Sequence, residues 1–187
     1  MIIDYTATYQ NYSEVVIQGF HKTAYKCPDC NGKGFHKHGV YKRYYTVWKD
    51  GATQTVQMDI LRIKCIECNK THAVLTRDMV PFRIYSLQLM ATILNMNFSY
   101  HYSLPEISSL TSISYQKLKD IQTWFQQNLD KITMLFESAE FRMESEIIDW
   151  ESVLTKLQDK FLKENNRVLF ENRRNGESYE LRHFFSG

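Results

Sequence analysis

Apolar residues recur with the period of a β-strand in the first half of the chain. Residues 31–64 are rich in β-branched and aromatic types, and Val56, Met58 and Ile60 alternate with polar neighbours. Asp50-Gly51, near the middle of this stretch, is a strong signal for a two-residue hairpin turn. The pattern therefore predicts two long antiparallel strands that run out and back.

The predicted strands cover residues 35–48 and 53–64, and a third strand over 72–76 completes a small sheet. After Ile60 the apolar positions change phase to Leu61 and Ile63. Because a change of phase moves side chains to the other face of a strand, it indicates a β-bulge or a sharp twist at this point.

The apolar period becomes helical after residue 84. Ser86 is a predicted N-cap, Ser103 and Glu106 form a capping box, and Ser114 is a predicted cap of a third helix. The residues expected to face inward are Leu87, Met90, Ile93, Leu94 and Phe98 in the first helix, Ile107 and Leu110 in the second, and Leu118, Ile121 and Phe125 in the third. This layout is that of a helix-turn-helix, and equally that of an ordinary small bundle.

The four cysteines form two identical spacings, Cys27-Pro-Asp-Cys30 and Cys65-Ile-Glu-Cys68, with none left over. Two such turns supply the tetrahedral four-sulfur shell that zinc prefers in structural sites. Two disulfides would require an oxidising compartment, and a thioredoxin-like site would leave one pair unexplained. The spacing therefore predicts a structural Zn²⁺ bound by all four thiolates. A shell of four sulfurs also argues against a catalytic zinc.

Charge changes the picture because it is unevenly distributed. The whole chain carries a net charge of +2, whereas residues 21–83 contain twelve basic and five acidic residues, a net charge of +7. Such a segment is typical of a surface that meets a polyanion, although a solvated basic face without a partner has the same composition. No apolar run reaches membrane length and no export signal precedes the strands, so we expect a cytoplasmic protein without membrane contact.

Cations and aromatic residues interleave on the predicted hairpin, a mixture that suits nucleic acid. Aromatic residues there could equally form the core of so thin a sheet. On the third helix, outward positions lie where a recognition helix meets base edges. The candidate DNA-binding residues are Lys33, Lys37, Lys42 and Arg43 of the hairpin region, and Tyr115, Gln116, Lys117, Lys119 and Gln122 of the third helix. His36, His38 and His72 are assigned to the surface or to packing, because four sulfurs already saturate the ion.

The segments CPDC, RIKCIEC, VPFRIYSLQL and SLPEISSLTSISYQKLKDIQTWF, in that order, resemble the front end of transposases from bacterial insertion sequences. The resemblance covers about residues 25–130. It implies a zinc ribbon with Cys27, Cys30, Cys65 and Cys68 as ligands, followed by a helix-turn-helix whose recognition helix starts within ISYQKLKDIQTWF. The chain is also similar to short, transposase-like bacterial proteins that lack the catalytic core. We expect no such core here, because too few residues follow the helical region for a nuclease fold.

Acidic residues cluster between 137 and 151, which raised the question of a two-metal site. Ile147, Trp150 and Leu154 recur there with a helical period, so we expect these acids on the solvated face of an amphipathic helix. Asn175-Gly176 signals a final hairpin, either a cap or a homodimer contact.

The predicted fold class is α+β, an antiparallel zinc ribbon followed by a helix-turn-helix region, a C-terminal helix and a hairpin. The expected divisions are an N-terminal segment (1–20), the ribbon (21–83), the helix-turn-helix region (84–136) and the C-terminal helix and hairpin (137–187). The expected function is binding of double-stranded DNA as a regulator or accessory factor, without catalysis or a small-molecule substrate. The alternatives are a protein-interaction module and an RNA-binding zinc ribbon.

Overall fold

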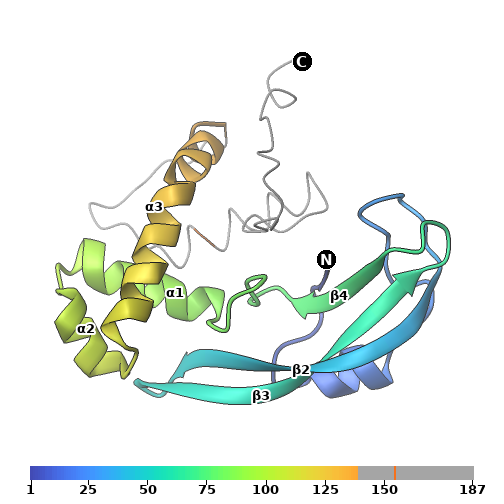
Figure 1. Cartoon of the computed structure of the whole chain (residues 1–187), viewed down its shortest axis with the longest axis horizontal. Coiled ribbons are helices and arrows are strands. Elements are labelled where there is room, and N and C mark those ends of the chain that lie inside the picture. The colour runs from blue at the N-terminus through green and yellow to red at the C-terminus, as the bar shows by residue number, and fades with distance from the viewer. Residues whose placement is uncertain (139–153, 155–187) are drawn as a thin grey trace.

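The computed structural model describes residues 1–138 and Leu154, and its centre is a curved four-stranded sheet with the helices of residues 87–138 gathered at one end (Figure 1). The strands lie in the order β1-β4-β3-β2. Their bounds are Ile2–Asp4 for β1, Phe35–Lys49 for β2, Ala52–Cys65 for β3 and Thr71–Thr76 for β4. With the helices that follow, this is the mixed α+β fold predicted from the two apolar periods.

The long hairpin of β2 and β3 confirms the predicted strands and their turn. Lys49 pairs with Ala52, and the two residues between them, Asp50 and Gly51, both have positive φ, 53° and 77°. This is the left-handed pair of a two-residue turn, which Asp and Gly adopt at low cost. Antiparallel pairing then continues to the other end of the hairpin, where Phe35 lies opposite Cys65.

The predicted change of phase in β3 is also confirmed, since Ile60, Leu61 and Ile63 are all buried. The register shift itself lies in the opposite strand, between Lys37 and Gly39 of β2. An extra residue on β2 lets β3 bury side chains on both faces near its end, where other elements cover it.

The N-terminal residues add a strand and a helix that the sequence pattern did not predict. β1 pairs in parallel with β4, and a short π-helical segment, η1 (Ser13–Gln18), packs on β3. Tyr12 ties them together, because its buried hydroxyl donates to the Val74 carbonyl at 2.6 Å and accepts from the Leu61 amide at 3.1 Å. Elements this short carry too few residues for a recognisable period.

The helical region consists of α1 (Leu87–Leu94), η2 (Asn95–Ser99), α2 (Leu104–Thr111) and α3 (Tyr115–Ser138). Ser86 caps α1 by accepting a hydrogen bond from the Leu89 amide at 3.0 Å, and Ser103 and Glu106 form the predicted capping box of α2. Ser112, with φ of 56°, ends α2 in the left-handed region and sends the chain into α3.

The helices share an apolar core that confirms most of the predicted inward positions, including Ile93, Ile107 and Leu118. Phe98 is a wrong prediction, since it is 38% exposed in η2, and so is Leu110 of α2, which is 53% exposed. In this two-turn helix the inner stripe passes through Ile107 and Thr111, whose hydroxyl donates to the Ile107 carbonyl at 2.7 Å. Trp124 of α3, which the pattern did not assign, is buried in the same core.

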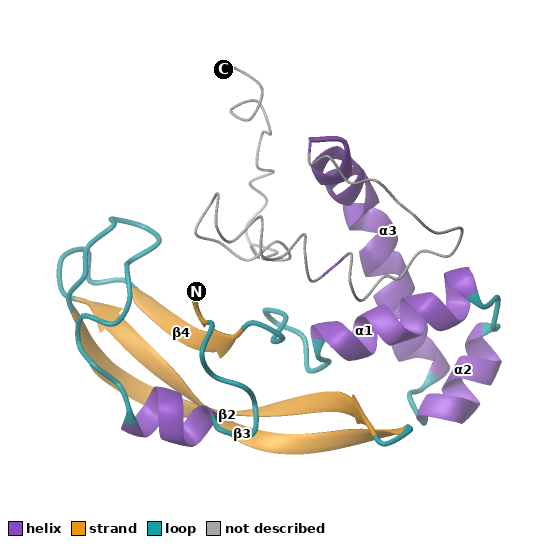
Figure 2. Ribbon diagram, turned by 180° about the vertical axis from the view of Figure 1, so that it is seen from behind, coloured by secondary structure: helices purple, strands orange, loops and turns teal. Residues whose placement is uncertain are grey.

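The hairpin connects the two regions. At its turn, the Thr53 hydroxyl donates to the carbonyl of Thr111 in α2 at 2.7 Å. In Figure 2 the helices lie beside this turn, and the loops that carry the cysteines lie at the opposite end of the sheet. Within the described residues no helix combines the length and the apolar character needed to cross a bilayer. The predicted C-terminal helix and hairpin lie outside the described residues, apart from Leu154, which is helical and buried.

Candidate metal centre

The two cysteine turns have the same backbone geometry. In the first, the Asn31 amide donates to the Cys27 carbonyl at 2.9 Å, and the Cys27 amide donates to the Gly32 carbonyl at 2.8 Å. In the second, Asn69 donates to Cys65 at 3.1 Å and Cys65 donates to Lys70 at 2.9 Å. Asn31 and Asn69 have φ of 64° and 60°, the left-handed conformation that asparagine tolerates. Asn occupies the same place in both turns, and each turn folds back on itself.

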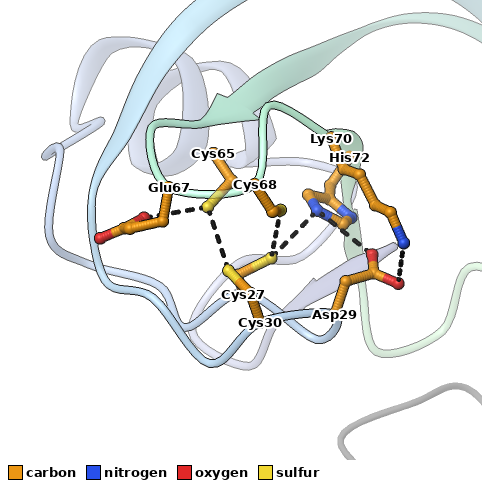
Figure 3. A network of polar contacts seen from close by, with 8 residues as sticks. All are labelled: Cys27, Asp29, Cys30, Cys65, Glu67, Cys68, Lys70 and His72. Atoms are coloured by element: carbon orange, nitrogen blue, oxygen red, sulfur yellow. Dashed lines mark hydrogen bonds and ion pairs between the residues drawn. The ribbon is translucent and has the colours of Figure 1, made fainter.

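Sheet register brings the two turns together. Because Phe35 pairs with Cys65 and the Ile66 amide donates to the Gly34 carbonyl at 2.9 Å, the second turn lies against the end of the first. The sulfurs of Cys27 and Cys68 are 3.6 Å apart, as are those of Cys30 and Cys65 (Figure 3). All four sulfurs lie within 4.8 Å of one another.

These separations suit one metal ion and no disulfide. A disulfide requires sulfurs about 2.05 Å apart. Four sulfurs placed tetrahedrally at zinc–thiolate distance would lie about 3.8 Å from one another. The four cysteines are free thiols in the structure, and their spacing is compatible with a metal ion at the centre of the group.

The protein environment shifts the pKa values of the thiols in opposite directions. Burial raises the pKa of Cys27 and of Cys65, whereas the backbone amide of Lys70 donates to the Cys68 sulfur and lowers the pKa of that thiol. The raised pKa favours the protonated thiols of Cys27 and Cys65 until a cation displaces the protons. Metal binding at such a site releases protons and strengthens as pH rises.

A polar network flanks the sulfurs on one side (Figure 3). Nε2 of His72 lies 3.4 Å from the Cys27 sulfur and 3.7 Å from a carboxylate oxygen of Asp29, which also pairs with Lys70 at 3.0 Å. His72 is 4% exposed, and burial lowers its pKa, which favours the neutral ring. His72 thus packs in the interior, as predicted, and lies beside Cys27, a candidate metal ligand. His36 and His38 are exposed on β2.

Four of the predicted DNA-binding residues of α3 form an exposed group at its start, namely Tyr115, Gln116, Lys117 and Lys119. Gln122 is partly buried and donates to the Asn97 side chain at 3.1 Å. An acid stands among them, because Asp120 accepts from Gln116 at 3.1 Å and pairs with Lys117 at 3.8 Å. The exposed face of α3 is therefore polar and of mixed charge.

The predicted residues of the hairpin region are dispersed. Lys33 is exposed beside the cysteine turns, Lys37 donates to the Ile17 carbonyl at 2.6 Å, and Lys42 pairs with Asp59 at 3.5 Å. Arg43 is partly buried, and its guanidinium donates to the carbonyls of Val80 and Arg83. The structure does not bring these side chains and the start of α3 into one contiguous group.

The structure also shows a groove that sequence reasoning did not predict. It has a volume of about 470 Å³ and is lined by Met1, Tyr41, Arg43, Arg62, Thr71, Ala73, Phe82, Arg83 and Ile84. Tyr41 and Arg43 lie on β2, and Arg43 is one of the predicted DNA-binding residues. No sequence signal links them to Arg62 or Phe82, because only the fold brings these segments together.

Comparison with known proteins gives one match. Residues 27–112 are similar to a family described as a domain of unknown function (DUF6431). The matched segment begins at the first metal-ligand candidate, contains all four cysteines and ends with α2, just before α3. The comparison with curated proteins and the comparison with solved structures each gave no match.

Proposed function

We propose that this protein is a DNA-binding protein in which a zinc ribbon supports a helix-turn-helix, and that it acts as a transposase-derived regulator or accessory factor without catalysis of its own. The observation that carries the proposal is that α2 and α3, joined by a turn that contains Ser112, pack with α1 around one core. Three residues separate the two helices, and the start of α3 is exposed while its other face is buried.

Zinc is the proposed metal because the ligand set consists of four thiolates from two Cys-x-x-Cys turns. Thiolate-rich tetrahedral groups select zinc among the common divalent ions. Four protein ligands close the coordination shell, so the ion stabilises the fold and does not activate water. The antiparallel strands that carry the turns correspond to the ribbon that the sequence resemblance implies.

The helical region has the packing that a helix-turn-helix requires. Leu94 of α1, Ile107 of α2 and Leu118 of α3 lie in one buried cluster, and Ile113 of the turn is buried with them. A rigid three-helix core of this kind holds the second helix of the motif at a fixed angle and leaves its N-terminal residues free to enter a major groove. There Gln116 would read adenine and Lys117 would read guanine or contact phosphate.

The charge distribution supports a polyanionic partner. Residues 21–83, which contain β2, β3 and β4, carry a net charge of +7, whereas residues 84–136 contain three basic and three acidic residues. In the proposed complex the sheet supplies sequence-independent attraction to phosphates, and α3 supplies discrimination among bases. The proposed site of action is the bacterial cytoplasm.

Selection of bound sequences from a random duplex pool, with the full chain, tests this proposal. With the selected duplex in hand, Lys117→Ala and Gln116→Ala should weaken binding to it by about tenfold and reduce the preference over random DNA. Lys22→Ala removes one exposed positive charge near the cysteine turns and is the matched control. Asp120→Asn should strengthen binding, because it frees Gln116 and Lys117 from the carboxylate.

The selection has outcomes that would contradict the proposal. If no sequence is enriched, or if the α3 variants and Lys22→Ala weaken all duplexes equally, α3 is not a recognition helix. Stronger binding to RNA than to duplex DNA at several salt concentrations would favour an RNA-binding zinc ribbon.

A protein-interaction module is the second candidate function. It is favoured by exposed apolar side chains in the helical region, namely Tyr100, Tyr102 and Leu110. Large exposed apolar side chains that gather on one region are typical of protein interfaces. This candidate predicts binding to neither nucleic acid in a filter-binding assay, at low or at high salt.

A further inference from the structure

The groove beside β3 combines features that point to a ligand of its own. Its floor is formed by strand residues, including Tyr41, Arg43 and Arg62, and the segment 82–84 that precedes α1 forms one wall. Its volume of about 470 Å³ falls within the range of small-ligand sites. None of the residues considered for zinc or for duplex recognition lines it except Arg43.

Positive charge is concentrated in this groove. Arg43, Arg62 and Arg83 line it, although the guanidinium of Arg83 lies over the Trp124 ring, 5.7 Å from its centroid. No acidic residue of the described part of the chain lines the groove. Arg43 is held by two backbone carbonyls, which fix its position without neutralising its charge. The Arg62 side chain is exposed, and its guanidinium makes no hydrogen bond or ion pair with the other described residues, so the part of the chain that the structure describes leaves its forked donors open to an anion.

An exposed aromatic ring stands at the wall of the groove. Phe82 is 64% exposed and has φ of 60°, a conformation that a bulky residue adopts only at a cost in free energy. Tyr41, on the strand, is also exposed. Because the Phe82 ring is exposed, its burial does not offset the strain in the backbone. Strained residues of this kind occur at ligand sites.

We propose that this groove binds one unpaired nucleotide of a DNA strand, with the base stacked on Phe82 and the phosphate held by Arg62 and Arg43. Arginine forks match phosphate oxygens, and aromatic rings stack on bases of any sequence. A base inside a duplex offers no free face for stacking, so the site selects unpaired strands. The inference goes beyond the proposed function, because duplex recognition by α3 neither needs nor provides such a site.

Fluorescence anisotropy with the full chain tests the proposal. The probes are a blunt duplex, the same duplex with a single-stranded thymidine tail, and the tail alone as DNA and as RNA. Adenosine monophosphate and inorganic phosphate serve as competitors. The tested variants are Arg62→Ala and Phe82→Gly, the second of which removes the ring and relieves the positive φ without a cost in stability.

Matched controls separate the site from general effects. Lys49→Ala removes an exposed positive charge at the hairpin turn, and Tyr100→Ala removes an exposed ring in the helical region. We expect Arg62→Ala and Phe82→Gly to weaken binding of the DNA tail by about tenfold each, and binding of the tailed duplex relative to the blunt duplex by a similar factor. Tyr100→Ala should leave every probe unaffected, and Lys49→Ala, which removes one charge of the basic segment, should weaken tailed and blunt duplex to the same extent. Phe82→Trp should retain binding of the tail, because it retains a stacking surface.

Three results would overturn the inference. One is equal binding of tailed and blunt duplex in every variant. Another is competition by inorganic phosphate as strong as that by adenosine monophosphate, which would mean an anion site without base stacking. The third is preference for the RNA tail over the DNA tail. Because α3 variants affect the blunt duplex and groove variants affect only the tail, failure of this inference and failure of the proposed function give different results.

Discussion

The sheet and the helical region are stabilised by different chemistry. The buried cluster of the sheet contains Cys27 and Cys65 together with hydroxyl-bearing rings such as Tyr12 and Tyr45. The buried cluster of the helices contains aliphatic residues, Met90, Trp124 and Phe125, with neither cysteine nor tyrosine among its buried members. The sheet therefore combines an apolar core with buried hydroxyl groups and the candidate metal ligands, whereas the helices depend on burial of apolar surface alone.

Titratable groups follow the same division. Burial raises the pKa of Tyr12 and Tyr45 and lowers that of His72, all in the sheet region. In the described part of the helices, Glu106 is an exposed carboxyl with a shifted pKa. Its pKa is lowered because Ser103 donates hydrogen bonds to it in the capping box. We therefore expect loss of metal, acid and oxidation to destabilise the sheet first. Substitutions that create a cavity should destabilise the helical region first.

We expect removal of the proposed zinc to distinguish the stability of the sheet from that of the helical region most clearly. Structural zinc in small domains contributes about 10–16 kcal/mol of apparent binding free energy that is inseparable from folding. A chelator, or Cys65→Ser, should unfold residues 25–80 and leave the helices of residues 86–127 folded, because their core contains no ligand. Hydrogen exchange read by mass spectrometry measures both segments in one experiment.

Native mass spectrometry of the same samples should show one zinc per untreated chain. His38→Ser, at an exposed position outside the ligand set, is the control and should retain the ion. A metal-free chain with full protection over β2 and β3 would contradict the prediction, as would two disulfides in the native protein.

A cavity in the helical core should have the reverse effect. Leu118 is completely buried between the helices, so Leu118→Ala should lower the free energy of unfolding of this region by about 2–5 kcal/mol. The zinc content and the exchange protection of the sheet should stay unchanged. Denaturation followed by circular dichroism measures the loss, with the neighbouring exposed position, Lys119→Ala, as control. Loss of zinc from Leu118→Ala would show that the regions fold as one unit.

Asp4 provides a smaller, acid-dependent test of the sheet. Its carboxylate accepts from the Thr6 amide at 2.9 Å, the Thr6 hydroxyl at 2.7 Å, the Ala7 amide at 3.0 Å and the Tyr25 hydroxyl at 2.7 Å. Burial alone would raise the pKa of Asp4, but these hydrogen bonds outweigh it and lower the pKa. Because the folded state holds the proton more weakly than the unfolded state, the stabilisation is complete above the ordinary aspartate pKa of 3.8 and is lost as pH falls below it.

Asp4→Asn should therefore cost about 1–3 kcal/mol near neutral pH and should make the sheet less sensitive to acid than the unchanged protein. Urea denaturation at a series of pH values between 7 and 3 measures this difference. Asp59→Asn, at an exposed residue paired only with Lys42, is the control. Parallel loss of stability with pH in Asp4→Asn and in the unchanged protein would assign the acid sensitivity to another group.

The smallest expected effect concerns the cap of α2. The Glu106 carboxylate accepts from the Ser103 amide at 2.7 Å and from the Ser103 hydroxyl at 2.6 Å. Ser103→Ala should lower the stability of the helical region by about 1 kcal/mol, and Ser103→Thr should restore most of it. Thermal denaturation read at the helical signal resolves the two variants. An effect on zinc affinity without an effect on the helices would contradict the division drawn above.

Local chemistry was predictable from the sequence. The Asp50-Gly51 turn, the caps at Ser86 and Ser103 and the two cysteine turns each depend on a few neighbouring residues, and all appear as expected. The equal spacing of the cysteine pairs also indicated a shared metal, since four thiols in two matched turns fit few other structures. Periodicity gave the inner face of α3 for the same reason, because a helix of this length repeats its pattern several times.

Contacts between distant segments were decided by the tertiary structure. The parallel pairing of β1 with β4, the burial of His72 beside Cys27 and the groove between Arg62 and Phe82 join residues far apart in the chain. A period tells which side of an element is apolar, but not which other element covers it. Leu110 shows the same limit, because in a helix of two turns the apolar stripe is too short to fix its own orientation, and packing against the neighbouring helices selected Thr111 in its place.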